Sequence, residues 1–313
     1  MEEGLGRIGV LMGGPSSERE ISLKSGRAVY QALKEQGLDV VPLEIYTDAE
    51  EKIKEADIAA AFIALHGKFG EDGRVQKILQ DLDIPYTGSG VIASFLCFDK
   101  VASRRVLKHC NITVPKYEVL QQASWKKRIE EISLNFPVVV KPSNQGSSVG
   151  ITFVNESSAL PAAVEYAFNY DDTALIDEYI NGREITVGIL DDAPLPVVEI
   201  VPKNKFFDFQ AKYEKGKTEY IVPARLSART AQRAQNIGLL AHRGLGCHSF
   251  SRVDMILADE HPVVLEVNSI PGLTATSLLP MAAQAEGIDF GRLCGRILQS
   301  AFCRRDELTQ SYV

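Results

Sequence analysis

The segment RVDMILADEHPVVLEVN, residues 252–268, constrains the fold most, because apolar and polar residues alternate on both sides of one turn. A loop at 258–262 predicts an antiparallel register in which Leu257 faces Val263. In that register one face carries only apolar side chains, namely Val253, Met255, Leu257, Val263, Leu265 and Val267. The segment is therefore predicted to be a β-hairpin that covers a core with one face.

The other face of this hairpin carries Arg252, Asp254, Glu266 and Asn268. The register sets Asp254 opposite Glu266, and two carboxylates in that position repel each other unless a cation lies between them. A small set of oxygen ligands suits Mg²⁺ that also binds substrate phosphates. The alternative is a solvated charged face in which Arg252 neutralises one acid. The Gly-containing turn that follows, SIPGLTATSL, favours the metal site.

Residues 141–150, KPSNQGSSVG, lie between two apolar runs and are nearly all small. Small residues let a backbone approach a ligand closely, and exposed N–H groups suit an anion such as a nucleotide phosphate. The G-x-x-x-x-G-K-[ST] spacing of a Walker A loop is absent. A flexible hairpin tip is the alternative, since these are common turn residues. Taken alone, this segment leaves both interpretations open.

The composition, 45% hydrophobic and 24% charged, is that of a soluble globular protein. A net charge of −7 disfavours a nucleic-acid surface, so a bound polyanion requires a local cluster of basic residues or a metal. The five cysteines form no C-x-x-C pair, which indicates reduced thiols. The first residues lack a signal-peptide pattern, and the longest apolar stretch is too short to span a bilayer. We therefore expect a cytoplasmic protein with no nucleic-acid or membrane partner.

Strand and helix patterns alternate through the first hundred residues, which predicts a parallel βαβ domain over 1–99. GGPSSE and LHGKFGEDG follow its apolar runs, at the carboxyl ends of strands where ligands usually bind. A smaller α+β unit with antiparallel strands is expected over 100–187, and a third region over 188–313. The fold class is thus α/β and α+β, in three domains.

Seven segments, in order, carry a resemblance: LMGGPSSEREISLKSG, ALHGKFGEDG, YTGSGVIASFLCFDK, VVKPSNQGSSVG, FDFQAKY, SRVDM and LEVNSIPGLTATSLLP. Together they resemble the D-alanine–D-alanine ligase family of the ATP-grasp superfamily, essentially from end to end. The resemblance implies a three-domain ATP-grasp architecture with a pre-ATP-grasp N-terminal domain, and ATP between the central and C-terminal sheets. It implies ATP-dependent ligation of two D-alanine molecules through D-alanyl phosphate, for peptidoglycan precursor synthesis.

The resemblance assigns ATP to the central and C-terminal domains. The implied ATP-binding residues are Lys100, Lys141, Ser148, Asp177, Glu178, Glu184 and Lys212. The two lysines Lys100 and Lys141 would bind phosphates under the loop 141–150, which acts as a flexible lid, and Glu184 would bind the ribose. Asp177 stands where the family commonly has a longer glutamate that contacts adenine, so Glu178 or backbone groups are the alternatives.

The resemblance also assigns the metal and the oxyanion groups. Asp254, Glu266 and Asn268 match the family's Mg²⁺ ligands, which are expected to hold two ions, with Mn²⁺ as a substitute. Arg252 and the Gly272 N–H match the groups that stabilise the tetrahedral oxyanion.

Substrate contacts follow from the same resemblance. Glu18 is similar to the glutamate that binds the first D-alanine ammonium, although a first-turn acid also stabilises a helix dipole. Ser147 and Tyr213 resemble the residues that complete a hydrogen-bonded clasp with Glu18. His66 resembles a residue near the first substrate, although a lone histidine is more often structural. The expected pocket for the second D-alanine contains Ser277 and Leu278.

Tyr213 bears on specificity, because a tyrosine at the end of the segment FDFQAKY accompanies dipeptide formation in the family. We therefore expect D-alanine as the second substrate, with D-serine or D-lactate as alternatives. A different ATP-grasp ligase and a non-catalytic nucleotide switch are the rival interpretations. The set Glu18, Ser147 and Tyr213 argues against the first, and Arg252 beside the metal ligands argues against the second. A homodimer is expected, as in other members of the family.

Overall fold

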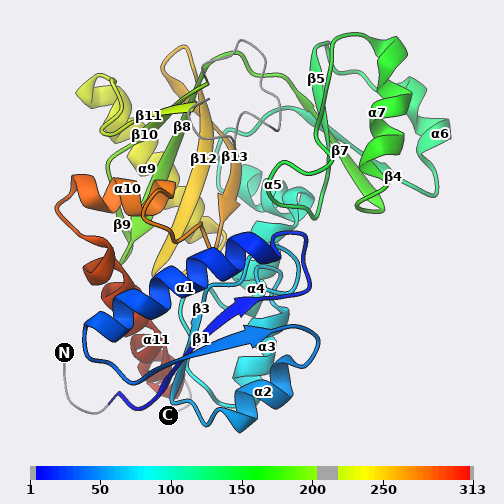
Figure 1. The fold of residues 1–313 in the computed structure, drawn as a ribbon. Coiled ribbons are helices and arrows are strands. Elements are labelled where there is room, and N and C mark those ends of the chain that lie inside the picture. Colours follow the sequence, from blue (N-terminus) through cyan, green and yellow to red (C-terminus); the bar gives the residue numbers. More distant parts are fainter. Residues whose placement is uncertain (1–4, 203–217, 311–313) are drawn as a thin grey trace.

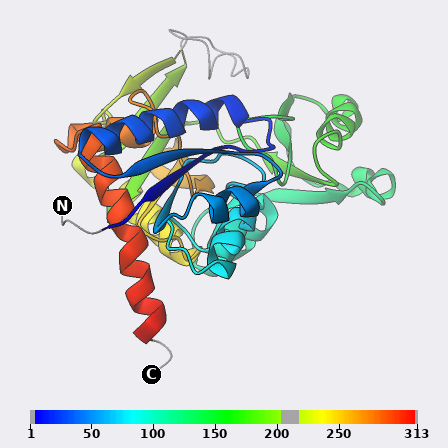
Figure 2. The ribbon, with the colours of Figure 1, turned by 60° about the horizontal axis from the view of Figure 1, so that its bottom comes forward.

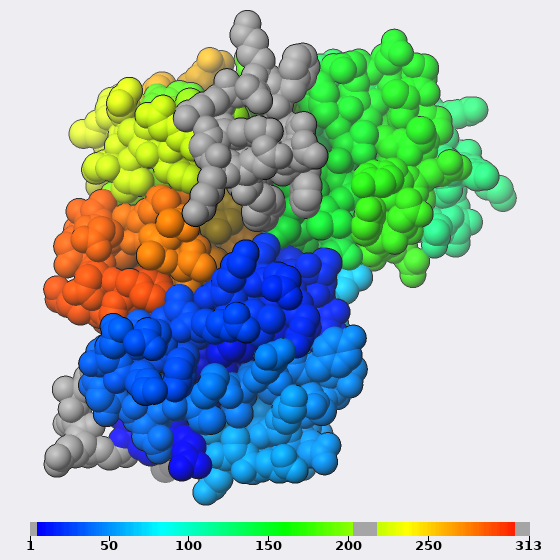
Figure 3. Space-filling view, in the orientation of Figure 1, coloured from blue at the N-terminus to red at the C-terminus, as the bar shows by residue number. Residues whose placement is uncertain are grey.

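The computed structural model describes residues 5–202 and 218–310, so Lys212 and Tyr213 lie outside the described residues. The described residues form three β-sheets with helices packed around them (Figure 1). In the space-filling view the N-terminal part, in blue, lies beneath both the green central part and the orange C-terminal part (Figure 3).

The N-terminal sheet is parallel, with strand order β2-β1-β3. Its strands are β1 (Ile8–Gly13), β2 (Val40–Ile45) and β3 (Ala60–Ile63), joined through helices α1 (Arg19–Glu35) and α2 (Ala49–Glu55) and followed by α3 (Arg74–Asp81). Every residue of β1 and β3 is buried, as expected for a parallel sheet with helices on its faces. This confirms the parallel βαβ prediction.

The second sheet is antiparallel, with strand order β4-β7-β5-β6. Its strands are β4 (Tyr117–Gln121), β5 (Val138–Pro142), β6 (Thr152–Val154) and β7 (Thr173–Glu178), with helices α6 (Trp125–Arg128) and α7 (Leu160–Ala167) and 3₁₀ turns η1 (Ile129–Glu131) and η2 (Ser157–Ala159). The side chains between this sheet and its helices form a core of their own, around Val140, Val164 and Ile176. The loop 143–151 therefore joins the inner strand β5 to the edge strand β6 of a compact unit.

The third sheet has strand order β11-β10-β8-β12-β13, and β9 pairs with β8. Its strands are β8 (Arg183–Leu190), β9 (Ala193–Pro194), β10 (Val198–Pro202), β11 (Thr218–Ile221), β12 (Phe250–Ala258) and β13 (His261–Asn268). The remaining helices are α4 (Val91–Phe98), α5 (Lys100–His109), α9 (Ala228–Gly244), α10 (Leu278–Ala285) and α11 (Phe290–Gln310). The expected boundary between 187 and 188 falls inside β8, which pairs along its length with β12.

The hairpin β12–β13 keeps the predicted register only near the site. Arg252 pairs with Asn268 and Asp254 with Glu266, but a β-bulge follows Asp254. Leu257 consequently faces Pro262 rather than Val263, and the expected five-residue loop is a turn at Asp259 and Glu260.

The bulge also exchanges two apolar side chains between the faces of β13. Val264 joins the core in place of Leu265, which is only partly buried. Asp259 and Glu260 adopt φ values of 44° and 66°, the left-handed geometry of a two-residue hairpin turn. Because the turn has only two residues, Leu257 pairs with Pro262, one residue earlier in β13 than predicted. The strand β13 then has one residue more than β12 between this pair and the pair of Asp254 with Glu266, and that residue forms the bulge.

The C-terminal helix α11 packs on the N-terminal sheet although it lies at the other end of the sequence. Leu293 and Ile297 of α11 share a core with Ile8 and Val10 of β1 and with Phe250 of β12. Figure 2 shows α11, in red, beside this sheet. The first and third sheets are thus joined by one continuous core, whereas the four-stranded sheet has a separate one.

Candidate active site

The polar face of the β12–β13 hairpin forms the floor of the site. Asp254 is only 6% exposed, and three side chains hold its carboxylate. Arg252 donates from Nε and Nη2 over 2.8 and 2.7 Å, Thr186 of β8 donates over 2.7 Å, and Asn268 Nδ2 lies 3.1 Å away. The pairing that the alternative interpretation expected, with Arg252 neutralising an acid, is therefore present in this structure.

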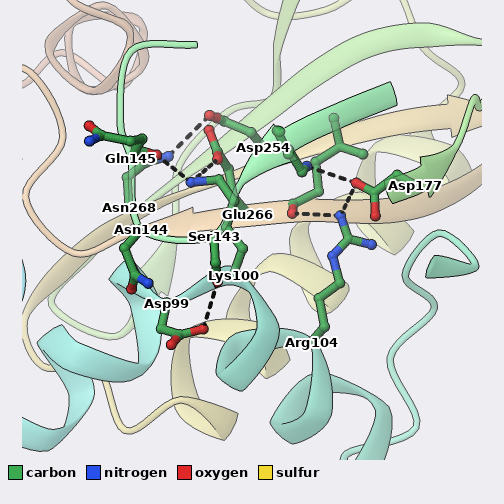
Figure 4. A network of polar contacts seen from close by, with 12 residues as sticks. Asp99, Lys100, Arg104, Ser143, Asn144, Gln145, Asp177, Asp254, Glu266 and Asn268 are labelled. Carbon is green, nitrogen blue, oxygen red and sulfur yellow. Dashed lines mark hydrogen bonds and ion pairs between the residues drawn. The ribbon is translucent and has the colours of Figure 1, made fainter. Parts of the chain in front are cut away.

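Lys100 approaches the same floor from the N-terminus of α5 (Figure 4). Its ammonium donates to the Gln145 carbonyl over 2.5 Å and lies 3.6 Å from a Glu266 carboxylate oxygen. Asp99 caps α5 through two backbone N–H groups and accepts a hydrogen bond from Ser143 over 3.0 Å. The helix cap and the loop 143–151 are thereby fixed to each other, and Lys100 is held between loop and hairpin.

Asp177 of β7 is the centre of a buried charge cluster (Figure 4). Its Oδ2 lies 2.8 Å from the Lys141 ammonium and accepts a hydrogen bond from Arg104 over 2.7 Å. Burial lowers the pKa of Lys141, and the neighbouring Asp177 opposes that shift. Asp177 thus contacts the lysine predicted to bind phosphate, and two cations share one carboxylate oxygen.

The two other acids predicted to bind ATP lie nearby on strands. Glu178, next to Asp177, accepts a hydrogen bond from the Lys116 N–H over 2.8 Å, so its carboxylate is engaged with backbone. Glu184 lies on β8 at the register position of Ile256 in β12. Both are partly exposed.

Glu18, which precedes α1 of the parallel sheet, contacts Ser147 in the loop 143–151 of the four-stranded sheet. The Ser147 hydroxyl donates to the Glu18 carboxylate, which lies at the N-terminal end of α1. A Cβ added to Gly146 would lie 2.4 Å from Glu18 Oε2, and one added to Gly67 would lie 2.7 Å from it. The carboxylate therefore fits between two positions that only glycine can occupy without displacement.

The loop around this contact has an uncommon backbone. Ser147 and Ser148 have φ values of 51° and 59°, a conformation that few non-glycine residues adopt. Asn144 anchors the loop, because its backbone and side-chain N–H groups both donate to Asp171, over 2.7 and 2.9 Å. The Val149 N–H donates to the Gly146 carbonyl over 3.1 Å, so residues 146–149 form a turn, a backbone arrangement that can suit an anion.

His66 follows β3 and is 5% exposed. Its Nε2 lies 3.0 Å from the Ser25 hydroxyl, and its ring is hydrogen-bonded to the Ile270 backbone. The Leu273 N–H in turn donates to Ser25 over 3.4 Å. His66 thus connects the N-terminal sheet to the turn that contains Gly272, and burial lowers its pKa to about 4.

Gly272, Ser277 and Leu278 are brought together where the turn after β13 meets α10. A Cβ on Gly272 would lie 3.0 Å from the Ser277 hydroxyl. Ser277 immediately precedes α10, and Leu278 is its first residue. The Thr274 N–H donates to the Ser277 hydroxyl over 3.1 Å, which fixes that side chain at the mouth of the turn.

Several residues at the site were missed by the sequence interpretation. Arg104, Thr186 and Ser25 carry no motif of their own, and only the three-dimensional contacts identify them. Glu71 lies inside the segment LHGKFGEDG that was singled out, and it accepts a hydrogen bond from the Gly67 N–H over 2.6 Å. Removal from water, with Glu18 nearby, raises the pKa of Glu71 well above its usual range.

The comparisons with known proteins agree with this geometry. Family models described as D-ala D-ala ligase C-terminus and N-terminus match residues 106–299, and 7–51 and 46–89. The D-alanine–D-alanine ligase of Geotalea uraniireducens (strain Rf4) is 47% identical over 94% of this chain and 95% of its own length. That of Syntrophotalea carbinolica is 44% identical over 96% of this chain and 97% of its own length.

Solved structures give the same picture. D-alanine–D-alanine ligase from Bacillus anthracis, complexed with ATP, has a TM-score of 0.85 at 36% identity and covers 98% of this chain and 100% of its own. The VanG D-Ala:D-Ser ligase of Enterococcus faecalis has a TM-score of 0.84 at 30% identity, over 95% of this chain and 99% of its own.

Two sheets that bring lysines, a small-residue loop and paired carboxylates together define an ATP-grasp enzyme. Within that class, the chain belongs to the D-alanine–D-alanine ligase family.

The buried His66 predicts a pH-dependent stability. The folded protein keeps His66 neutral down to about pH 4, whereas the unfolded chain takes up the proton below about 6.5. Stability is therefore lost as the pH falls from about 6.5 toward about 4. Between pH 7.5 and 5, wild type should lose about 2 kcal/mol more unfolding free energy than His66→Gln, measured by urea titration at each pH. The exposed His109→Gln should follow wild type, and parallel curves for wild type and His66→Gln would contradict the assignment.

Proposed function

We propose that the protein joins two D-alanine molecules to D-alanyl-D-alanine, with ATP converted to ADP and phosphate through a D-alanyl phosphate intermediate. The observation that carries the proposal is the meeting of Glu18 and Ser147 across two sheets, beside the cations and carboxylates of the ATP-grasp domains. This is a ligase of the ADP-forming kind, and its product is used in peptidoglycan precursor synthesis.

ATP lies between the four-stranded and six-stranded sheets in this proposal. Lys100 and Lys141 neutralise phosphate oxygens, and the loop containing Ser148 covers them with its backbone N–H groups. The cluster around Asp177 supports this role, because it holds the Lys141 ammonium in place when no nucleotide is bound. Glu178 and Glu184 are assigned to the nucleoside end, together with Lys212.

Asp254, Glu266 and Asn268 are assigned to Mg²⁺. The assigned donor set consists of the carboxylates of Asp254 and Glu266, which are cross-strand partners, and the amide oxygen of Asn268. Hard oxygen donors in that small number fit Mg²⁺ that completes its shell with phosphates and water. When bound, the ions neutralise charge that develops on the phosphates, and Mn²⁺ satisfies the same ligands.

The first step brings two anions together, so positioning and charge neutralisation dominate it. Glu18 accepts hydrogen bonds from the ammonium of the first D-alanine, and Ser147 and Tyr213 close the clasp around it. The D-alanine carboxylate oxygen then attacks the γ-phosphorus and ADP leaves. His66 acts by positioning the turn that contains Gly272, through Ser25 and the Ile270 backbone.

The second step forms the peptide bond. The neutral amine of the second D-alanine attacks the acyl carbon of D-alanyl phosphate, and phosphate leaves. Arg252 and the Gly272 N–H stabilise the oxyanion of the tetrahedral intermediate. Ser277 and Leu278 receive the carboxylate and methyl group of this second substrate.

We further propose that D-alanine is preferred over D-serine or D-lactate as the second substrate. The likeness to a D-Ala:D-Ser ligase shows that this fold also supports a serine-specific site. None of the helices in the described part of the chain has the length and apolar character to cross a membrane. A cytoplasmic homodimer without nucleic-acid or membrane partners completes the proposal.

The reaction is tested by phosphate release from ATP and Mg²⁺, with products weighed by mass spectrometry. D-alanine alone should support release and yield the dipeptide, whereas L-alanine should not. In mixtures of D-alanine with D-serine or D-lactate, the D-alanyl-D-alanine product should dominate. A depsipeptide or D-alanyl-D-serine as the main product would overturn the assigned specificity, and release that does not depend on an amino acid would overturn the ligase function.

Arg252→Ala tests the oxyanion role. Loss of one oxyanion donor typically costs about 10²–10³ in kcat, and we expect a loss in that range. ATP affinity, measured by calorimetry, should stay within about threefold of wild type, because Lys100 and Lys141 remain. Arg252→Lys is the matched control that keeps the charge beside Asp254. An equal loss of ATP affinity and turnover would show that Arg252 only positions Asp254.

Gly146→Ala tests the contact between Glu18 and the loop. The new methyl group would lie 2.4 Å from Glu18 Oε2, so either the carboxylate or the loop must move and their contact changes. The KM for D-alanine should rise about tenfold or more, since a displacement near 1 Å has large kinetic effects. Gly291→Ala, whose nearest new contact is 3.4 Å, is the matched control and should behave as wild type. An unchanged KM in Gly146→Ala would remove the clasp from the mechanism.

A further inference from the structure

Two thiols that the ligase reaction does not use lie side by side. Cys97 Sγ is 3.3 Å from Cys247 Sγ, although 150 positions separate the two residues in sequence. Cys97 lies in the last turn of α4, and Cys247 lies in the segment between α9 and β12. All five cysteines are free thiols in this structure, and Cys110 and Cys303 are exposed.

The surroundings make the two thiols unequal. Cys97 is 6% exposed, whereas Cys247 is partly exposed and therefore the one that solvent reaches. Hydrogen bonds with the Cys97 and Ser89 side chains lower the pKa of Cys247, although its burial opposes that shift. The same hydrogen bond with Cys247, together with burial, raises the pKa of Cys97 well above its usual range. Ser89 is itself held by the His248 N–H over 3.2 Å. Cys247 is thus the nucleophile of the pair and Cys97 the resolving thiol.

We propose that Cys97 and Cys247 form a redox-modification site, in which a peroxide oxidises the pair to an intramolecular disulfide that slows the ligase reaction. The Cys247 thiolate attacks one peroxide oxygen, the O–O bond breaks, and a sulfenic acid and hydroxide form. The Cys97 sulfur then attacks the Cys247 sulfur, the S–O bond breaks, and water leaves. The two cysteines together lose two electrons and two protons, and hydrogen peroxide is reduced to two molecules of water.

The position of the pair connects oxidation to the active site. Cys97 lines a small cavity together with Phe98, Lys100, Glu266 and Asn268. A disulfide requires the sulfurs to approach from 3.3 Å to about 2 Å, which draws the end of α4 toward the α9–β12 segment. Lys100 follows Cys97 by three residues, and its contacts with Gln145 and Glu266 move with that end of α4.

The test uses the full chain with Cys110→Ser and Cys303→Ser as background, which removes the exposed thiols. Stoichiometric hydrogen peroxide is added, the excess is removed, and peptides are mapped without reduction. We expect a cross-linked Cys97–Cys247 peptide and a mass loss of two hydrogens. D-alanine-dependent phosphate release should fall about tenfold or more and return with dithiothreitol. Cys97→Ser and Cys247→Ser on the same background should give no cross-link and show equal activity after peroxide and dithiothreitol.

The peptide map reads the modification independently of ligase activity. Absence of the cross-link, or a cross-link through Cys294, would overturn the site itself. A complete cross-link with unchanged turnover would overturn its effect on the reaction. Loss of activity that persists in both single variants would assign peroxide sensitivity to another residue and also contradict the proposal.

Discussion

Burial of charge is the constraint on which the site depends. Asp254 and Asp177 are 6% and 3% exposed, and a carboxylate at that depth is stable only with cations or several hydrogen bonds around it. The Asp254 carboxylate accepts hydrogen bonds from Arg252, Thr186 and Asn268. The Asp177 carboxylate forms an ion pair with Lys141 and accepts a hydrogen bond from Arg104. The partners of Asp254 lie on three strands of its own sheet, whereas Asp177 requires β5 of its sheet and helix α5, so the packing of α5 decides whether Asp177 is satisfied.

The cores explain which part of the molecule is free to move. The first and third sheets share one core through α10 and α11, whereas the four-stranded sheet has its own core and contacts that of the third sheet through Tyr117 of β4. Its loop 143–151 meets the rest through polar contacts, chiefly Ser147 with Glu18 and Gln145 with Lys100. Polar contacts exchange with water far more readily than a shared apolar core. Opening and closing of the four-stranded sheet over a nucleotide is therefore the motion that the packing allows.

Apolar runs that alternate with helix patterns predicted the parallel sheet, and strict period-two alternation predicted the pairing of Asp254 with Glu266. It misplaced Leu265, since a bulge arises from turn geometry at Asp259 and Glu260 that the apolar pattern does not encode. Arg104 and Ser25 were missed because each acts through partners distant in sequence. The roles of the site residues came from family resemblance rather than from periodicity.

The cationic side chains gathered at the site explain how a chain with a net negative charge can bind a polyanion. The net charge is −7, yet Arg104 and Lys141 share a single oxygen of Asp177, and Lys100 lies within 3.6 Å of Glu266. Burial lowers the pKa of Lys141, which means that its charged form is destabilised when no phosphate is present. In the proposed binding mode, a nucleotide phosphate adds negative charge beside Lys141 and opposes the effect of burial on its pKa. The proposed binding thus depends on local charge compensation in a desolvated site, and exposed charges more than a Debye length away are largely screened.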